Sequence, residues 1–363
     1  MSNMLLFTEI QSENIYKSTD SLVSMCKREG GLYGDQARFI FTDAPPMYDW
    51  LGHTQEEANN LLKLFRAPNP EVQQVVIDEF KVVPLTVDQY LTKRAFADEG
   101  SFSLFNSTIL AWLSDVKNAY EMTKLLTFIG TTKSEEGNQS VVIDLPQLSA
   151  DATNEEEIAY NKMVAETVAK RIADLMIEVK DLSRDYNDAG QLKSFNPDDL
   201  VFVVNADFYN SLTKLGLPNI FHKDGLDDKL NEHVQPPKYF GDTLTTSGTA
   251  PESNNSIRSK IYKDYNTVTP DNPSYDKTKQ IYPGMLLPGG QSYNANEAYT
   301  EDAKEVVKIF HRKSIPWLTG FTTATDFFNG SSLTNTHRLF FGHSDLEYLV
   351  GYPFISISLN YPG

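Results

Sequence analysis

The six histidines are the first residues to test for chemistry, because imidazole is a common metal ligand and general base. His337 and His343 are six residues apart, and Asp345 follows them. His222 precedes Asp224 by two residues. Neither arrangement has the i, i+4 spacing of a two-histidine site on a helix, and the sequence contains no HExxH motif. We therefore expect polar or stacking roles for these histidines and no metal site.

Paired carboxylates could support acid and base chemistry, and the chain contains adjacent pairs such as Glu301–Asp302 and Asp227–Asp228. Because the sequence has 49 acidic residues, such pairs arise by chance, and we interpret them as solvated surface. Residues 185–190, DYNDAG, resemble part of a calcium-binding loop but lack its closing glutamate. They also coincide with the expected end of a helix, which explains their composition better.

Motifs for phosphate binding and nucleophilic catalysis are absent from the sequence. It contains no GxxxxGK[ST], no GxGxxG after an expected strand and no GxSxG. Residues 287–290, LPGG, are typical of a turn. We therefore expect no catalytic, cofactor-binding or metal-binding residues.

The overall charge and the cysteine content exclude further classes of protein. A chain of 363 residues with a formal net charge of -17 repels a phosphate backbone. Its basic clusters, Lys93–Arg94 and His311–Lys313, are too short to form a nucleic-acid-binding stripe. Cys26 is alone, which excludes an internal disulfide and fits a reducing compartment. No basic stretch precedes Met4–Phe7 and no apolar run reaches membrane-spanning length, so we expect neither a secretory signal nor a membrane partner.

One long amphipathic helix, Asn154–Ala189, is the element around which we expect the chain to be organised. Thr153 and Glu156 have the spacing of a capping box, and Gly190 suits a helix end. Its length of about 35 residues predicts a rod of about 50 Å with a solvated acidic side. The apolar positions with helical spacing are Ile158, Val164, Val168, Ile172, Leu175, Met176, Val179, Leu182 and Tyr186.

Before this helix we expect an arm, an extended stretch and a second helix. Helical pieces are predicted near residues 15–27 and 54–65 of a polar leading arm. Residues 71–87 are rich in β-branched side chains, and Pro84 restricts them to an edge strand or a bulge. Helical spacing returns over residues 102–129 and is closed by Gly130.

The flanking strands indicate a small α/β lobe. Residues 141–145 form a predicted strand, and the apolar run 200–204 predicts a strand buried on both faces, followed by a helix to Leu215. The polar segment 235–299 is expected to be either a loop insertion or a surface ordered by a partner. Near the end of the chain, residues 354–359 alternate as a half-buried strand does.

This order of elements resembles the major capsid proteins of tailed bacteriophages, which have the Hong Kong-type capsid fold. Residues 87–99, VDQYLTKRAFADE, are similar to a stretch in capsid proteins of small short-tailed phages with Gram-positive hosts. Residues 200–215 look like the strand and helix that enter the axial domain of that fold. The resemblance implies an α+β structural protein without catalysis, which self-assembles into an icosahedral or prolate head shell around double-stranded DNA.

The resemblance also implies a division of the chain and a set of partners. The expected parts are an N-terminal arm and helix (1–70), an extended hairpin loop region with a connecting helix (71–150), the spine helix of the peripheral domain (151–195), an axial domain with a loop-rich insertion (196–304) and return strands to the peripheral domain (305–363). Pentameric and hexameric capsomers, a portal, a scaffolding protein and DNA held by proximity are the expected partners. The expected location is the virion, after assembly in the host cytoplasm.

Three other interpretations stay open at this point. An encapsulin-like nanocompartment shell would share the fold and enclose an enzyme. A carboxylate-dependent hydrolase using Glu301 or Asp302 would be a stable monomer with an acid-lined cleft. A surface adhesin would use the tyrosine-rich segment 235–299, although no export signal supports it.

Overall fold

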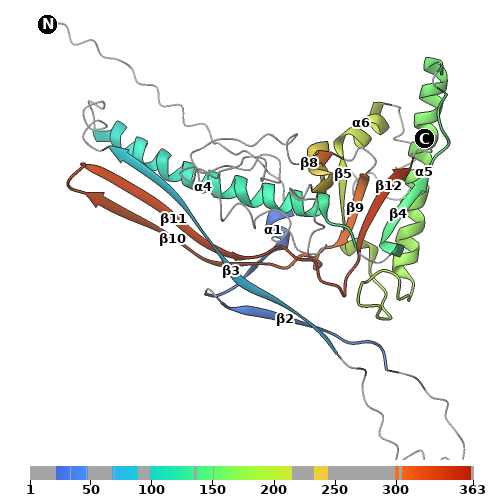
Figure 1. The fold of residues 1–363 in the computed structure, drawn as a ribbon, viewed down its shortest axis with the longest axis horizontal. Coiled ribbons are helices and arrows are strands. Elements are labelled where there is room, and N and C mark those ends of the chain that lie inside the picture. Colours follow the sequence, from blue (N-terminus) through green and yellow to red (C-terminus); the bar gives the residue numbers. More distant parts are fainter. Residues whose placement is uncertain are drawn as a thin grey trace, which may run out of the picture.

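Two five-stranded sheets and two long helices dominate the fold (Figure 1). We name the sheet with strand order β1-β10-β11-β3-β2 the wing sheet, and the sheet with order β4-β12-β9-β5-β6 the lobe sheet. The computed structural model describes residues 22–32, 34–45, 47, 68, 70–88, 99–134, 137–149, 151–214, 233–243, 299–301 and 305–360.

The wing sheet joins strands that are distant in the sequence. Its strands are β1 (Lys27–Glu29), β2 (Gln36–Phe41), β3 (Glu71–Asp88), β10 (Trp317–Asn329) and β11 (Thr334–Ser344). Strand β3 pairs with β2 over residues 71–76 and with β11 over residues 77–88. Among the described strands, Pro84 therefore lies where β3 has a partner on one side, which confirms the predicted edge position.

Part of the expected N-terminal arm is held by the chain itself. Helix α1 (Leu22–Cys26) buries Leu22 and Cys26 completely or nearly so, and β1 pairs in parallel with β10. The contacts of these residues with the core therefore hold this part of the arm within the subunit itself. The predicted helices near residues 15–27 and 54–65 otherwise fall outside the described residues.

The lobe sheet lies between two layers of helix (Figure 1). Its strands are β4 (Ser140–Asp144), β5 (Leu200–Asn205), β6 (Val234–Gln235), β9 (Glu305–His311) and β12 (Phe354–Asn360). Helices α5 (Asn154–Lys180) and α6 (Ala206–Lys214) cover one face, and the last turns of α4 (Glu99–Thr131) cover the other. Strand β5 is buried at every position, as its apolar run predicts.

Short elements complete the described chain. They are the two-stranded pair β7 (Gly241–Thr243) and β8 (Tyr299–Glu301) and the 3-10 helices η1 (Gly137–Gln139), η2 (Pro197–Asp199) and η3 (Pro237–Tyr239). Most of the polar segment 235–299 falls outside the described residues. None of the described helices is both long enough and apolar enough to span a membrane.

Helix α5 starts as predicted and ends nine residues earlier. The Thr153 hydroxyl accepts from the Glu156 N–H, and the Glu156 carboxylate accepts from the Thr153 N–H, so the capping box is confirmed. The helix ends at Lys180 after 27 residues, which gives a rod of roughly 40 Å. Gly190 instead takes a positive φ of 59° in the following turn. The spacing of apolar residues predicted too long a helix, because Leu182 and Tyr186 continue the apolar period although the chain there is not helical.

Three further expectations differ from the structure. Helix α4, at 33 residues, is longer than α5, and it continues through Gly130. Strand β12 is a central strand between β4 and β9, and not a half-buried one, because both of its faces are covered. Helix α5 and strand β5 share one hydrophobic core, so the expected boundary at residue 195 does not separate two cores.

Gly130 gives a test of how closely α4 approaches η3. A Cβ on Gly130 would lie 1.9 Å from the Tyr239 carbonyl oxygen. In an unconstrained helix, alanine would be more stable than glycine by about 1 kcal/mol, whereas overpacking costs about 1–3 kcal/mol. We expect Gly130→Ala to lower the thermal unfolding midpoint measured by circular dichroism. Gly330→Ala is the control, because nothing lies within 4 Å of its Cβ position; an unchanged midpoint in Gly130→Ala would contradict the close approach.

Candidate functional site

The residues singled out for chemistry are dispersed over the fold. His337 Nδ1 lies 2.6 Å from Asp326 Oδ1, across the hairpin of β10 and β11. His343 is buried beneath α4, where its Nε2 lies 3.2 Å from the Tyr120 hydroxyl. Burial lowers the pKa of His343 to about 3, so the ring is neutral near pH 7. The two histidines therefore contact different partners and do not converge on one site.

Most of the acidic pairs cannot be placed. Glu301 is the last residue of β8. His222, Asp224, Asp227, Asp228 and Asp302 lie outside the described residues. Within the described ranges, no group of three or more His, Cys, Asp or Glu side chains could hold a metal ion.

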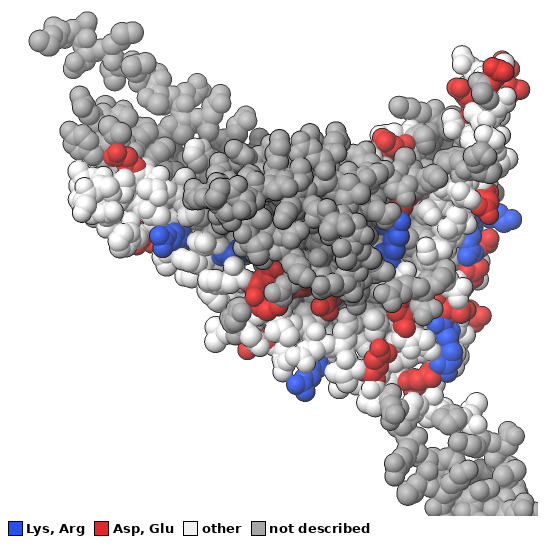
Figure 2. All heavy atoms as spheres, viewed as in Figure 1, with Lys and Arg blue, Asp and Glu red and all other residues white. Residues whose placement is uncertain are grey.

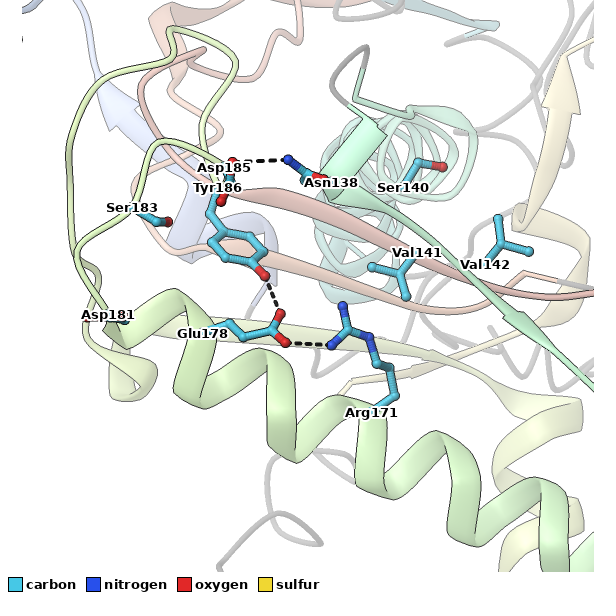
Figure 3. Close-up of a pocket in the computed structure, with 10 residues that line it drawn as sticks. All are labelled: Asn138, Ser140, Val141, Val142, Arg171, Glu178, Asp181, Ser183, Asp185 and Tyr186. Atoms are coloured by element: carbon cyan, nitrogen blue, oxygen red, sulfur yellow. Dashed lines mark hydrogen bonds and ion pairs between the residues drawn. The ribbon is translucent and has the colours of Figure 1, made fainter.

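A hollow of about 500 Å³ lies between β4, the second half of α5 and the turn that follows it (Figure 3). Arg171 Nη1 donates to Glu178 Oε1 at 2.8 Å, and the Tyr186 hydroxyl donates to Glu178 Oε2. At the other end of the hollow, Asn138 Nδ2 donates to Asp185 Oδ1 at 3.1 Å. In Figure 3, Tyr186 therefore points from the turn toward Glu178 and Arg171 of α5, and Asn138 and Asp185 point toward each other.

The electrostatics of this hollow favour one protonation state each for Glu178 and Tyr186. Hydrogen bonds from Arg171 and Tyr186 hold the pKa of Glu178 below its usual range. Burial, followed by donation to Glu178, raises the pKa of Tyr186 well above its usual value. Glu178 consequently remains a carboxylate and Tyr186 remains protonated, so the three side chains fasten the turn to α5.

A second group of polar side chains is buried between α4 and the wing sheet, and we name it the buried cluster: Glu79, Lys81, Lys124, His343 and Asp345. Lys124 has no exposed surface, and its Nζ lies 3.5 Å from Asp345 Oδ1 and 3.6 Å from Glu79 Oε2. Lys81 Nζ lies 3.5 Å from the same Glu79 oxygen. Two ammonium groups and two carboxylates therefore balance in a site from which water is largely excluded.

The sequence contained one signal for this cluster. Lys117, Glu121 and Lys124 are spaced by four and three, so they share the side of the helix on which Tyr120 and Phe128 are found. Charges at these spacings on the apolar side of a helix indicate buried ion pairs. Their partners on β3 and after β11 could not be identified without the fold.

Another ionic contact fixes the chain where it leaves β2. Asp43 Oδ2 accepts from Arg184 Nη1 at 2.7 Å, and its Oδ1 accepts from the Leu192 N–H at 2.9 Å. Beside it, Lys193 Nζ lies 5.0 Å from the centre of the Phe41 ring. These contacts join the end of a wing strand to the loop that follows α5.

The wing-sheet face opposite α4 carries several exposed or partly exposed apolar side chains, and we name this set the open face: Phe80, Val82, Phe321, Phe327 and Phe340. Phe80 lies 5.3 Å from Phe321 and 5.9 Å from Phe340 between ring centres. Phe327 is 61% exposed, Phe80 47% and Val82 46%. In Figure 2 the charged side chains gather along α5, whereas the described atoms around the β10–β11 hairpin are mostly uncharged. Such a patch marks a protein interaction surface.

The comparison with protein families identifies the kind of protein. The sequence profile of the Phi29-like phage major capsid protein matches residues 17–338. The chain belongs to this family. It is therefore a structural protein of the phage head, and this finding favours the capsid interpretation over the nanocompartment, hydrolase and adhesin interpretations.

Solved structures agree on the fold of this capsid protein. It is similar to a chain of the capsid of Staphylococcus phage Andhra, with 12% identity and a TM-score of 0.63, over 99% of this chain and 90% of that one. It is also similar to a chain in a structure of the head fibre and inner core protein of bacteriophage P68, with 14% identity and a TM-score of 0.57, over 99% and 90% of the two chains. No curated protein matches the sequence. The predicted α+β capsid fold is confirmed.

The contact at Asp43 predicts a pH-dependent contribution to stability. The Leu192 N–H and the Arg184 guanidinium lower the pKa of Asp43 from 3.8 to about 2. Because the pKa is lower in the folded state, the contribution is present above pH 3.8 and is lost as the pH falls through 2. We expect Asp43→Asn to lower the unfolding midpoint at pH 7 and the difference from the wild type to vanish near pH 2. Asp151→Asn, at an exposed position, is the control; a difference that persists unchanged in acid would refute the assignment.

Proposed function

We propose that this capsid protein builds its shell from pentameric and hexameric capsomers, in which a copy of the chain covers the open face of its neighbour. The observation that carries this proposal is the open face itself. Phe80 and Phe327 leave large aromatic area in contact with water, which costs about 25 cal/mol per Å² until it is covered. A ring of identical subunits makes heterologous contacts of this kind, in which different surfaces of the copies meet.

The arrangement of the two sheets supports a revised division into domains. The wing sheet with α4 has the extended form expected of a peripheral domain. The lobe sheet with α5 and α6 has a continuous core and suits the axial domain near the capsomer centre. We therefore assign the spine to α4 in place of residues 151–195, and we assign α5 to the axial domain.

The proposed contents and partners follow from charge and compartment. Double-stranded DNA would be enclosed by proximity, because a net charge of -17 disfavours tight binding of phosphate. A portal and a scaffolding protein are proposed as partners of the growing shell. Cys26, a buried free thiol, is compatible with assembly in the reducing cytoplasm of the host. The shell would need no catalysis by this chain.

A charge placed on the open face tests the proposed contact. Phe327→Asp adds a carboxylate at a 61% exposed position, so the subunit should fold while the interface, in which that charge would be desolvated, should not form. We expect shell particles in negative-stain images of the wild type, and slowly sedimenting subunits for Phe327→Asp. The far-ultraviolet circular dichroism of both proteins should be the same.

Ser331→Asp is the matched control for this experiment. Ser331 lies in the turn of the same hairpin and is exposed, and it does not belong to the open face. It should assemble as the wild type does. Normal particles from Phe327→Asp would count against the role of the open face, whereas a wild type that forms no closed shell under any assembly condition would count against the proposed function.

A further inference from the structure

The buried cluster places an amine beside two carboxyl groups in a site that is shielded from water. Lys124 comes from α4, Glu79 from β3, and Asp345 from the chain directly after β11. The exposed fraction is 0% for Lys124, 4% for Glu79 and 8% for Asp345. The Lys124 amine is 3.5 Å from an oxygen of Asp345 and 3.6 Å from an oxygen of Glu79. These are the three groups required to form an amide bond between side chains without a separate enzyme: a nucleophile, an electrophile and a proton carrier.

We propose that Lys124 and Asp345 condense to an intramolecular isopeptide bond, with Glu79 carrying the proton. The nucleophile is the neutral Lys124 amine, whose lone pair attacks the carboxyl carbon of Asp345. A bond forms between Nζ and Cγ, the bond from Cγ to one carboxyl oxygen breaks, and that oxygen leaves as water. Glu79 carries two protons in turn from the Lys124 nitrogen to the Asp345 oxygen that leaves: the first makes the amine neutral before it adds, and the second is lost from the nitrogen as the bond from Cγ to oxygen breaks. Ammonium and carboxylate thus become amide and water, with no oxidant or other reactant.

The surroundings favour each part of this reaction. Lys124, Asp345 and Glu79 have little exposed surface, so little water competes with the amine for the carboxyl carbon. The Leu346 N–H donates to Asp345 Oδ1 at 3.0 Å, and can stabilise the negative charge that develops on this oxygen when the amine adds. Fixing the two groups side by side also removes the entropy cost of bringing them together.

Glu79 is held where it can transfer protons. Its Oε2 atom lies 3.5 Å from Lys81 Nζ, 3.6 Å from Lys124 Nζ and 3.9 Å from His343 Nε2. Lys81 favours the carboxylate form, which is the form that accepts the first proton. The neutral His343 ring leaves this charge balance unchanged.

Lys308 provides a comparison within the same chain. It is 1% exposed, and its Nζ lies 2.9 Å from Glu305 Oε2. Its ammonium also donates to the Thr132 carbonyl at 3.0 Å and to the Ser356 hydroxyl at 2.9 Å. Three acceptors at ordinary hydrogen-bond distances stabilise the charged form of Lys308, so we expect it to stay an ammonium.

The mass of the denatured wild-type protein tests the proposal directly. We expect an intact mass that is lower than the sequence mass by one water molecule. Trypsin cleaves after Lys and Arg, so a modified Lys124 should be skipped. Peptide 118–133 should then be recovered joined to the C-terminal peptide 339–363, which contains Asp345 and no Lys or Arg. Cleavage after Lys308 should be complete.

Glu79→Gln tests the proton carrier, because it keeps the shape of the side chain and removes its basicity. We expect this variant to have the full sequence mass and to be cleaved after Lys124. An unmodified wild type, with complete cleavage after Lys124, would overturn the proposal even if the variant fails to fold. Loss of water that maps to other peptides would also overturn it, and loss of water in Glu79→Gln would remove Glu79 from the mechanism.

Discussion

The packing of one helix against two sheets is the constraint on which the rest of this subunit depends. The last turns of α4 bury Leu125, Phe128 and Ile129 against the lobe sheet, and full burial of such side chains contributes about 1.5–3 kcal/mol each. Farther toward its start, the same helix places the Tyr120 ring 5.9 Å from Phe341 of the wing sheet. A rigid helix that belongs to both cores fixes one sheet relative to the other. The subunit can therefore be extended and still keep its two sheets in a fixed relative orientation, as a repeated subunit of a shell requires.

The two faces of the wing sheet bury their side chains to different extents. The face covered by α4 contains charged groups such as Glu79, whereas the open face carries phenylalanines such as Phe80. Charges buried in this way contribute little net stability, since each loses several kcal/mol of hydration. They do specify how the helix and the sheet meet, because a shifted register would separate ammonium from carboxylate. The open face is left uncovered in the single subunit, and under the proposed function its burial is gained on assembly.

The sequence predicted the elements whose stabilising contacts lie within a few residues, and it failed where those contacts join distant parts of the chain. The capping box at Thr153 and the buried strand β5 were predicted because their signals lie within a few residues. Strand β12 was misjudged because Ser356 was expected to face solvent. It is buried and accepts a hydrogen bond from Lys308, 48 residues earlier in the chain. The end of α5 was predicted too late because Tyr186 continues the helical spacing in the sequence. In the structure Tyr186 lies in a turn, and its hydroxyl donates to Glu178. The partners of Lys124 in the buried cluster could not be identified from the sequence for the same reason, since they come from separate elements.

The two groups of ionisable residues show why a hollow is a poor guide to chemistry in this fold. Around the hollow beside α5, Glu178 is hydrogen-bonded by Arg171 and Tyr186, and these bonds fix every proton in place. Stabilised charges of this kind are unreactive because any proton transfer would break strong interactions. In the buried cluster, by contrast, the Lys124 amine lies 3.5 Å from an oxygen of Asp345 and 3.6 Å from an oxygen of Glu79, with little exposed surface on any of the three side chains. In a structural protein we therefore expect reactive groups where ionisable side chains are both buried and close together. The junction of α4 with the wing sheet meets both conditions.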